Sequence, residues 1–310
     1  MPEPLKLKYD ILIITGPTAS GKTALAAALA DRLNGEIISA DSRQVYRSMD
    51  IGTGKDYDDY ITGGRRIPCH LIDIADPGYK YNVFEYQRDF LKIYKNLKQR
   101  RVFPILCGGS GMYIDSIVSG YRMYEVPPDP ELRAWLEKKT MDELVDILSS
   151  YKKLHNKTDI DTKKRAIRAI EIEEYNRSVS IGQTFLPELK YLIAGVSVER
   201  DTRRRRISER LRKRFDSGMI DEVKRLIDSG VSVESLIWYG LEYKYITLYL
   251  NGKIDYDTMF RELEIAIHQF AKRQMTWFRG MERKGIVINW IDGELPKEEN
   301  VERVMKLLNS

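Results

Sequence analysis

The 310-residue sequence has few cysteines and no long apolar run, and these absences exclude several classes of protein. Cys69 and Cys107 are too few for a disulfide framework or a tetrahedral zinc site, and both lie in apolar segments, so we expect buried free thiols. No apolar stretch approaches the roughly 20 residues that cross a bilayer. The first residues, MPEPLKLKYD, lack the apolar stretch of a secretory signal. We therefore expect a cytoplasmic protein that does not act on a membrane.

Positive charge is concentrated in a few segments. The net charge is only +5, but nine of the fifteen residues from Arg200 to Arg214 are Lys or Arg. Further basic groups occupy residues 163–168 and 272–283. One such run is typical of a solvated helix face. Three of them in the same half of the chain favour a polyanionic partner.

The most specific pattern is GPTASGKT, which fits G-x-x-x-x-G-K-[ST]. An apolar, strand-like run (residues 9–15) precedes it and a helix-favouring run (residues 23–33) follows it. In such a loop the backbone N–H groups surround a diphosphate, while the lysine and the hydroxyl serve phosphate oxygens and Mg²⁺. We predict a diphosphate-binding loop with Thr23 as the Mg²⁺ ligand. Its residues are Gly16, Pro17, Thr18, Ala19, Ser20, Gly21, Lys22 and Thr23.

Strand-like and helical segments alternate, which predicts an α/β fold with a P-loop NTPase-like parallel sheet flanked by helices. The expected strands are residues 9–15, 36–39, 70–74, 102–107 and 191–198. The carboxyl ends of parallel strands meet at one edge of a sheet. The phosphate loop, Asp41 and residues 108–111 should therefore share one cleft.

Residues 127–189 interrupt this alternation with charged, helix-favouring sequence. We predict one helix from Pro128-Asp129-Pro130 to Ser150 and another over residues 161–175. The expected organisation is a first part of the core, a helical insertion domain, and the remainder of the core with C-terminal helices. Their limits are 1–126, 127–189 and 190–310.

The residue spacing of two later helices predicts which of their faces are apolar. In the helix that begins near Thr202, an apolar face should dock on the core while an arginine stripe beside it meets an anion. The apolar face is Ile207, Leu211 and Phe215, and the stripe is Arg203, Arg206, Arg210 and Arg214. A second helix aligns Phe260, Leu263, Ile267, Phe270, Gln274 and Trp277, whose apolar members we expect in the core.

The phosphate loop alone does not fix the reaction, since kinases, ATPases and GTPases share it. A kinase that uses Asp41 to deprotonate an acceptor hydroxyl is compatible with the spacing. The loop combines with other motifs, however: ISADSRQVYRSMDIGTGK (38–55), HLIDIADP (70–77), GGSGMYI (108–114), RAIRAIE (165–171) and AKRQMTWFRG (271–280). Together they resemble the tRNA dimethylallyltransferases, of the bacterial type that lacks a C-terminal zinc finger.

This resemblance implies transfer of a dimethylallyl group from dimethylallyl diphosphate to N6 of the adenosine on the 3′ side of the anticodon. The substrates would be tRNAs that read codons starting with U, bound by their anticodon stem-loops, and the enzyme a monomer. The resemblance assigns Asp41 as general base and Arg210, with Thr23 and Mg²⁺, to the departing pyrophosphate. Family positions that contact tRNA match Asp41, Ser42, Arg43, Gln44, Ser110, Arg133, Lys164, Arg165, Ala166, Ile167 and Arg168.

Several of these residues have a purely structural alternative. Ser110 could cap a helix, and Arg165 and Arg168 could pair with Glu171 and neighbouring acids. The segment from Tyr239 to Lys244 departs from the Gly-Tyr-Lys that many members of the family carry. Three rival functions stay open at this point: an isopentenyltransferase of free adenine nucleotides, a small-molecule kinase, and a non-catalytic RNA-binding protein.

Overall fold

The computed structural model describes residues 8–121, 123–152, 158–178 and 186–310. The chain divides into two compact units. Unit 1 consists of Met1–Tyr121 and Pro187–Ser310, and unit 2 consists of Arg122–Leu186. Within the described ranges, no helix is long and apolar enough to cross a membrane.

A six-stranded sheet in the order β5-β2-β6-β1-β7-β8 forms the centre of unit 1. All neighbouring strands are parallel. The central strand β1 is buried along its whole length, which is why its sequence is a continuous apolar run. The strands are β1 (Ile11–Thr15), β2 (Gly35–Ser39), β5 (Cys69–His70), β6 (Phe103–Gly108), β7 (Tyr191–Ser197) and β8 (Asn289–Asp292). The predicted P-loop NTPase-like sheet is confirmed.

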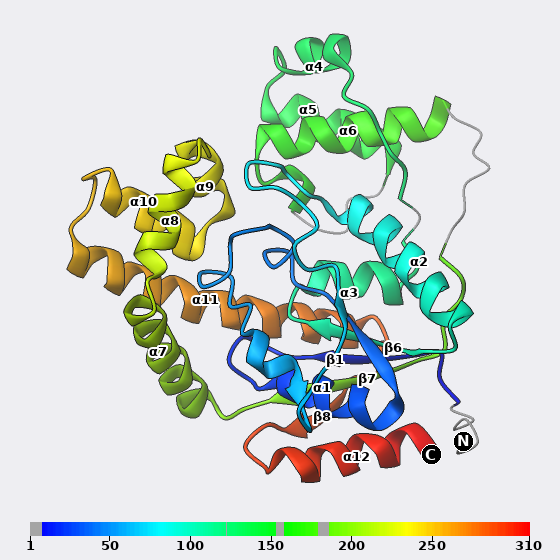
Figure 1. Cartoon of the computed structure of the whole chain (residues 1–310). Coiled ribbons are helices and arrows are strands. Elements are labelled where there is room, and N and C mark those ends of the chain that lie inside the picture. The colour runs from blue at the N-terminus through cyan, green and yellow to red at the C-terminus, as the bar shows by residue number, and fades with distance from the viewer. Residues whose placement is uncertain (1–7, 122, 153–157, 179–185) are drawn as a thin grey trace. The chain divides into compact units, whose positions relative to one another are not determined.

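Helices cover both faces of this sheet (Figure 1). On one face α1 (Lys22–Leu33) and α12 (Lys297–Asn309) share an apolar core with the strands. On the other face lie α2 (Val83–Gln99) and α3 (Gly111–Val118). The further helices of unit 1 are α7 (Arg200–Asp216), α8 (Met219–Asp228), α9 (Val233–Tyr239), α10 (Leu241–Leu250) and α11 (Tyr256–Arg283). Its short elements are η1 (Tyr57–Tyr60), β3 (Ile61–Thr62) and β4 (Arg65–Arg66).

The predicted faces of α7 and α11 are confirmed in part. Ile207 and Leu211 of α7 are buried, as are Leu263 and Ile267 of α11. The prediction that Trp277 belongs to the core is wrong, because 37% of its surface is exposed. Its ring lies over Gly111, where an added Cβ would come within 2.3 Å of the indole. The indole therefore packs on bare backbone at the start of α3 with its outer edge in solvent.

The strand predicted at residues 70–74 is wrong beyond His70. Leu71 and Asp73 have φ values of 62° and 57°, a left-handed conformation that ends an extended strand. The turn places the Asp73 carboxylate against the buried ammonium of Lys55, which also donates to the Tyr46 carbonyl at 2.6 Å. A buried charge needs such partners, so the turn at Asp73 stabilises the buried Lys55 ammonium.

Unit 2 is helical, with a small apolar core of its own. It contains α4 (Pro130–Leu136), α5 (Met141–Tyr151), η2 (Thr158–Ile160) and α6 (Lys163–Ser178). The single helix predicted from Pro130 to Ser150 is wrong, since the helix ends at Leu136 and a new one starts at Met141. The reason is a capping box in which Thr140 and Glu143 exchange hydrogen bonds of 2.7 and 3.3 Å.

The buried carboxylate of Glu171 organises the polar contacts of unit 2. It accepts hydrogen bonds from the Arg133 guanidinium at 2.8 and 2.7 Å and from the Asp129 N–H at 2.7 Å, and it also contacts Arg168. Burial acts to raise the pKa of Glu171, but these hydrogen bonds outweigh it and hold the pKa below its usual value. The ionised carboxylate therefore stabilises the folded unit.

We predict that Glu171→Gln destabilises unit 2 by about 1–3 kcal/mol at pH 7, because an amide cannot satisfy all these donors. A lowered folded pKa means that the contribution is present above the unfolded pKa of about 4.3 and is lost as the pH falls through the folded pKa. Hydrogen exchange of unit 2 amides at pH 7 and in acid measures the difference. The exposed Glu137→Gln is the control. Equal protection of Glu171→Gln and wild type at pH 7 would refute this prediction.

Candidate active site

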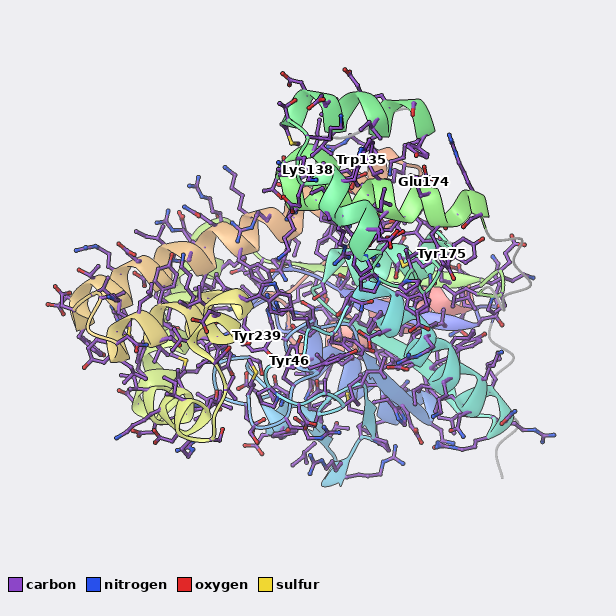
Figure 2. The ribbon with its side chains drawn as sticks, turned by 90° about the horizontal axis from the view of Figure 1, so that it is seen from above. Tyr46, Trp135, Lys138, Glu174, Tyr175 and Tyr239 are labelled. Carbon is purple, nitrogen blue, oxygen red and sulfur yellow. The ribbon has the colours of Figure 1, made fainter. Side chains whose placement is uncertain are left out.

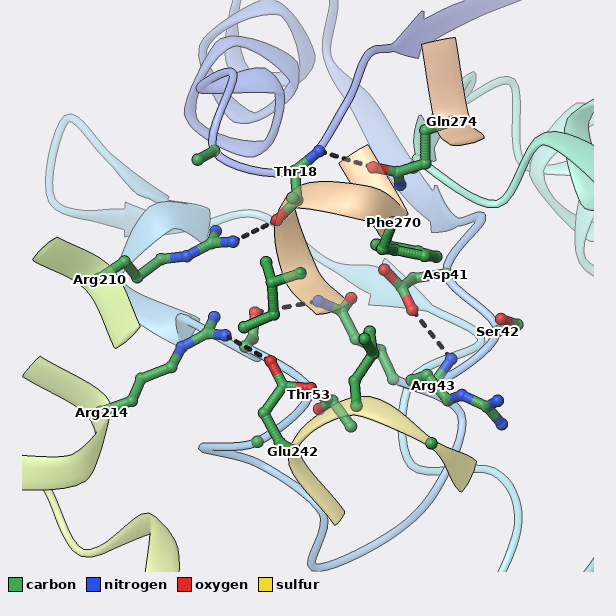
Figure 3. Close-up of a pocket in the computed structure, with 18 of the residues that line it drawn as sticks. Thr18, Asp41, Ser42, Arg43, Thr53, Arg210, Arg214, Glu242, Phe270 and Gln274 are labelled. Atoms are coloured by element: carbon green, nitrogen blue, oxygen red, sulfur yellow. Dashed lines mark hydrogen bonds and ion pairs between the residues drawn. The ribbon is translucent and has the colours of Figure 1, made fainter. Parts of the chain in front are cut away.

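The loops that follow β1, β2 and β6 meet at the carboxyl edge of the sheet, as predicted. Together with residues of α7, α10 and α11 they line a cavity of about 590 Å³ (Figure 3). Lys22, Asp41 and Gly108 each contribute to its wall from a different loop or strand end. The whole cavity is formed by residues of unit 1.

The phosphate loop has the backbone geometry that its sequence predicts. Gly16 has a φ of 151°, and a Cβ there would lie 2.5 Å from the Val196 carbonyl oxygen, so only glycine fits. Gly21, with a φ of 86°, leads directly into α1. The first turn of α1, all of it described, carries no acidic side chain. Its N–H groups and helix dipole therefore face the cavity as an anion site.

Lys22 is placed to serve the same anion. Its ammonium donates to the Pro17 carbonyl at 3.4 Å within the loop. Burial lowers the pKa of Lys22, while Cys107 and Asp41 act to raise it. A desolvated ammonium gains most from a charged ligand, since few competing waters surround it.

Arg210 of α7 joins the loop from outside the sheet. Its guanidinium donates to the Thr18 hydroxyl (Figure 3). Burial, and then the neighbouring Arg214, lower the pKa of Arg210 to about 10, against the opposing effect of nearby carboxylates. The guanidinium therefore stays charged at neutral pH and lies beside the loop.

Gln274 of α11 connects two of the loops, a role that the sequence analysis did not assign to it. Its side-chain oxygen accepts from the Thr18 N–H at 2.8 Å, and its amide nitrogen donates to the Gly109 carbonyl at 2.9 Å. The side chain is buried. A lone polar residue on an otherwise apolar helix face was the available signal.

Arg214 and Glu242 add a second charged group to the cavity. Arg214 lies 3.8 Å from the Glu242 carboxylate and 3.6 Å from that of Asp56. Burial raises the pKa of Glu242, with Arg214 acting in the opposite direction. Glu242 therefore brings a carboxylate into the cavity wall.

Asp41 follows β2 and is fixed by the residues after it. One carboxylate oxygen accepts from the Arg43 N–H at 2.9 Å (Figure 3). The Gln44 side chain donates to the Gly54 carbonyl at 3.0 Å, which ties the end of this turn to the neighbouring loop. The Asp41 carboxylate is thus oriented by the backbone within the cavity wall.

Ser110 is linked to the same turn. It stands at the N-cap position of α3, but its hydroxyl accepts from the Ser42 N–H at 2.9 Å and makes no capping bond to that helix. Its own N–H donates to the Ala40 carbonyl at 3.0 Å. Asp41, Ser42, Arg43, Gln44 and Ser110, predicted to contact tRNA, are therefore brought together.

The other predicted tRNA contacts lie in unit 2. Arg133 and Arg168 bind Glu171, and Arg165 pairs with Asp161 at 2.9 Å. Lys164 is exposed. Ala166 and Ile167 are buried in the core of unit 2, so a contact with RNA from this stretch falls to the side chains of Lys164, Arg165 and Arg168.

The donors in the cavity suit Mg²⁺ bound largely by a substrate. Within the described ranges, no group of three or more His, Cys, Asp or Glu side chains is placed to hold a metal ion. Thr23 lines the cavity beside Lys22. Mg²⁺ commonly takes one or two protein ligands and completes its shell with phosphate oxygens and water, and Thr23 fits that role.

Comparison with known proteins agrees with this architecture. The family model described as IPP transferase matches residues 44–281. A tRNA dimethylallyltransferase 2 of Phocaeicola vulgatus is 60% identical over 303 residues, which cover 98% of this chain and 99% of that protein. A tRNA dimethylallyltransferase 1 of Parabacteroides distasonis is 58% identical, with 97% and 98% covered.

Solved structures are similar as well. The full-length tRNA isopentenylpyrophosphate transferase of Bacillus halodurans superposes with a TM-score of 0.70 at 30% identity, covering 97% of this chain and 96% of that one. A eukaryotic dimethylallyltransferase acting on tRNA shares the fold, with a TM-score of 0.74 at 21% identity over 91% of this chain and 73% of that one. The chain belongs to the IPP transferase family, which includes the tRNA dimethylallyltransferases.

Proposed function

We propose that this chain is a tRNA dimethylallyltransferase. It transfers a dimethylallyl group from dimethylallyl diphosphate to N6 of the adenosine on the 3′ side of the anticodon, in tRNAs that read codons starting with U, and releases pyrophosphate. Family membership supports the reaction class. The observation that carries the assignment is that a phosphate loop and the fixed carboxylate of Asp41 line one cavity.

The donor's diphosphate would bind to the loop of residues 16–23. As the bond between the allylic carbon and the diphosphate oxygen breaks, negative charge grows on the leaving group. Lys22, Arg210 and the N-terminal N–H groups of α1 supply preorganised positive charge for it. Mg²⁺ held by Thr23 would add a further positive charge at the phosphate oxygens. The cavity thereby favours departure of pyrophosphate.

The acceptor amine would lie against Asp41. The lone pair of an adenine N6 is delocalised into the ring, so the amine is a weak nucleophile. Asp41 would accept the N6 proton as the new carbon–nitrogen bond forms, and the hydrogen bond from the Arg43 N–H keeps its carboxylate oriented. The base must leave the stacked anticodon loop to reach this carboxylate.

We further propose that unit 2 is a tRNA-binding insertion. Lys164, Arg165, Arg168 and Arg133 give it basic side chains that can contact phosphates. Arg133 and Arg168 form ion pairs with Glu171, so the exposed Lys164 would be more available to bind an RNA phosphate. We expect the enzyme to work in the cytoplasm as a monomer.

Gln274 provides a test of how the phosphate loop is held. Gln274→Leu should raise the KM for dimethylallyl diphosphate about 5- to 20-fold, because the Thr18 N–H and the Gly109 carbonyl lose a buried partner. Steady-state kinetics with varied donor measure this. Gln269→Leu, an exposed residue of the same helix that also lines the cavity, is the matched control. A donor KM unchanged by Gln274→Leu would show that the hydrogen bonds of Gln274 to Thr18 and Gly109 are not needed to hold the phosphate loop.

The function itself is tested by offering the purified protein labelled dimethylallyl diphosphate with either unmodified tRNA or AMP. Label on tRNA and none on AMP is the expected result. Transfer to AMP alone would establish an enzyme of free adenine nucleotides, and phosphate transfer from ATP without prenylation a kinase. Tight tRNA binding that survives Asp41→Asn, with no turnover by wild type, would identify a non-catalytic RNA-binding protein.

A further inference from the structure

An exposed tryptophan lies at the edge of the cavity, next to a firmly anchored tyrosine. Tyr239, the last residue of α9, is buried and packs against Tyr46 with ring centroids 4.6 Å apart (Figure 2). Its hydroxyl accepts from the Gly78 N–H at 2.6 Å and donates to the Tyr79 carbonyl at 3.1 Å. The preceding Trp238 has 44% of its surface exposed. Its backbone is thus fixed while its indole faces solvent.

Two cationic side chains lie near this indole. The Arg43 guanidinium lies 5.3 Å from the Trp238 ring and 5.6 Å from the Tyr239 ring, and the Lys80 ammonium lies 5.8 Å from the Trp238 ring. Lys244 and Arg273 line the same cavity. An aromatic face among cations is the pattern with which proteins hold a single-stranded base and its phosphates. It attracts a polyanion and offers the base a stacking surface, which an apolar partner would not require.

The position of Trp238 relative to Asp41 selects which base it would meet. The backbone N–H of Arg43 binds the Asp41 carboxylate at 2.9 Å, and the side chain of the same residue reaches Trp238. Arg43 therefore contacts both Trp238 and Asp41, the proposed proton acceptor. When the target adenosine is seated at Asp41, the nucleotide next to it in the RNA is the one brought to the edge of the cavity.

We propose that Trp238, held beside Arg43 and Lys80, stacks on the base that flanks the target adenosine and so helps to keep that adenosine turned out of the anticodon loop. The proposal rests on the proposed function for the identity of the RNA. It assigns Trp238 a binding role that is separate from proton transfer and from the diphosphate site.

The test uses a synthetic anticodon stem-loop and two versions that lack the base on the 5′ or on the 3′ side of the target adenosine. Stacking on one base predicts that Trp238→Ala lowers kcat/KM for the intact RNA about 5- to 100-fold. Trp238→Phe, which keeps an aromatic face, should retain most of the wild-type value. The KM for dimethylallyl diphosphate should stay within about twofold of wild type for both variants, since the ring contacts of Trp238 are with Arg43, Lys80 and Tyr239 and not with the phosphate loop.

The abasic RNAs separate stacking from a general loss of fit. With one of them, the wild type should lose as much as Trp238→Ala loses on intact RNA, and the variant should lose nothing further. Trp135→Ala is the control, because this tryptophan is 49% exposed and has Lys139 5.2 Å from its ring, but belongs to unit 2. Any effect of Trp135→Ala should be the same on intact and abasic RNA.

A Trp238→Ala variant that matches wild type on intact RNA would overturn the proposal, and so would an equal loss on the intact and both abasic RNAs. Failure of the proposed function gives a different result, namely a wild-type protein that transfers nothing to the intact stem-loop. In that event the same comparison, made by RNA binding in the absence of donor, still decides whether Trp238 stacks on a neighbouring base.

Discussion

Asp41→Ala is expected to lower kcat about 10²- to 10⁴-fold while pyrophosphate still binds. The Asp41 carboxylate is held by the Arg43 N–H just after the end of β2, where the acceptor amine is proposed to bind. Its loss therefore removes the proton acceptor and leaves Lys22, Arg210 and the loop N–H groups in place. Single-turnover rates on tRNA give the chemical step, and calorimetric titration with pyrophosphate gives the affinity.

The matched control is Asp56→Ala, which removes another carboxylate that lines the same cavity. Asp56 is about half exposed and lies 3.6 Å from Arg214, so its loss should change kcat by no more than about fivefold. A different outcome would reassign Asp41. If Asp41→Ala weakens pyrophosphate binding as much as it slows turnover, the residue serves the diphosphate or its metal instead of the acceptor amine.

Arg210→Ala is expected to lower kcat/KM about 10²- to 10³-fold and to weaken pyrophosphate binding as well. The partly buried guanidinium lies beside Thr18 of the phosphate loop, where its positive charge would meet the departing pyrophosphate. Arg210→Lys should recover only part of the loss, because an ammonium lacks the planar pair of donors. Donor-dependent kinetics and pyrophosphate titration measure both effects.

Arg212→Ala serves as the control for Arg210, since it removes a charge from the same helix on its exposed side. Arg212→Ala should bind pyrophosphate with wild-type affinity if that affinity depends on direct contact with Arg210 and not on the net charge of α7. Unchanged kinetics of Arg210→Ala would remove the residue from the site. Equal losses in both arginine variants would point to a general electrostatic effect of the helix.

The parts of the site that follow strand ends could be predicted from the sequence, because local patterns specify them. The phosphate loop has a strand before it and a helix after it, and both flanks are present. Parallel strands bring their carboxyl ends together, which places Asp41 in the same cavity as Lys22. In each case a short stretch of chain contains the information.

Other parts of the site depend on tertiary contacts that no local pattern reveals. Gln274 meets Thr18 across 256 residues of sequence. Arg214 and Glu242 come from different helices, and Trp238 depends on how Tyr239 anchors α9. Residue types alone do not show that these side chains share a cavity, since their contacts arise only when the helices pack.

The errors in secondary structure have physical causes of two kinds. A new helix begins after Thr140 because of a capping box, and its Thr-x-x-Glu pattern can be recognised in the sequence. The end of β5 is set instead by the buried Lys55, whose need for the Asp73 carboxylate belongs to the tertiary fold. β8 (Asn289–Asp292) was not predicted, because four residues at the edge of a sheet give little periodic signal.

The most direct test of the central claim is nucleoside analysis of tRNA from bacteria that make no N6-dimethylallyladenosine and express this chain. We predict that the modified nucleoside appears at the adenosine on the 3′ side of the anticodon in tRNAs that read codons starting with U, and that Asp41→Ala, expressed at the same level, yields little or none. Accumulation of folded wild-type protein without any N6-dimethylallyladenosine in the tRNA would contradict the account.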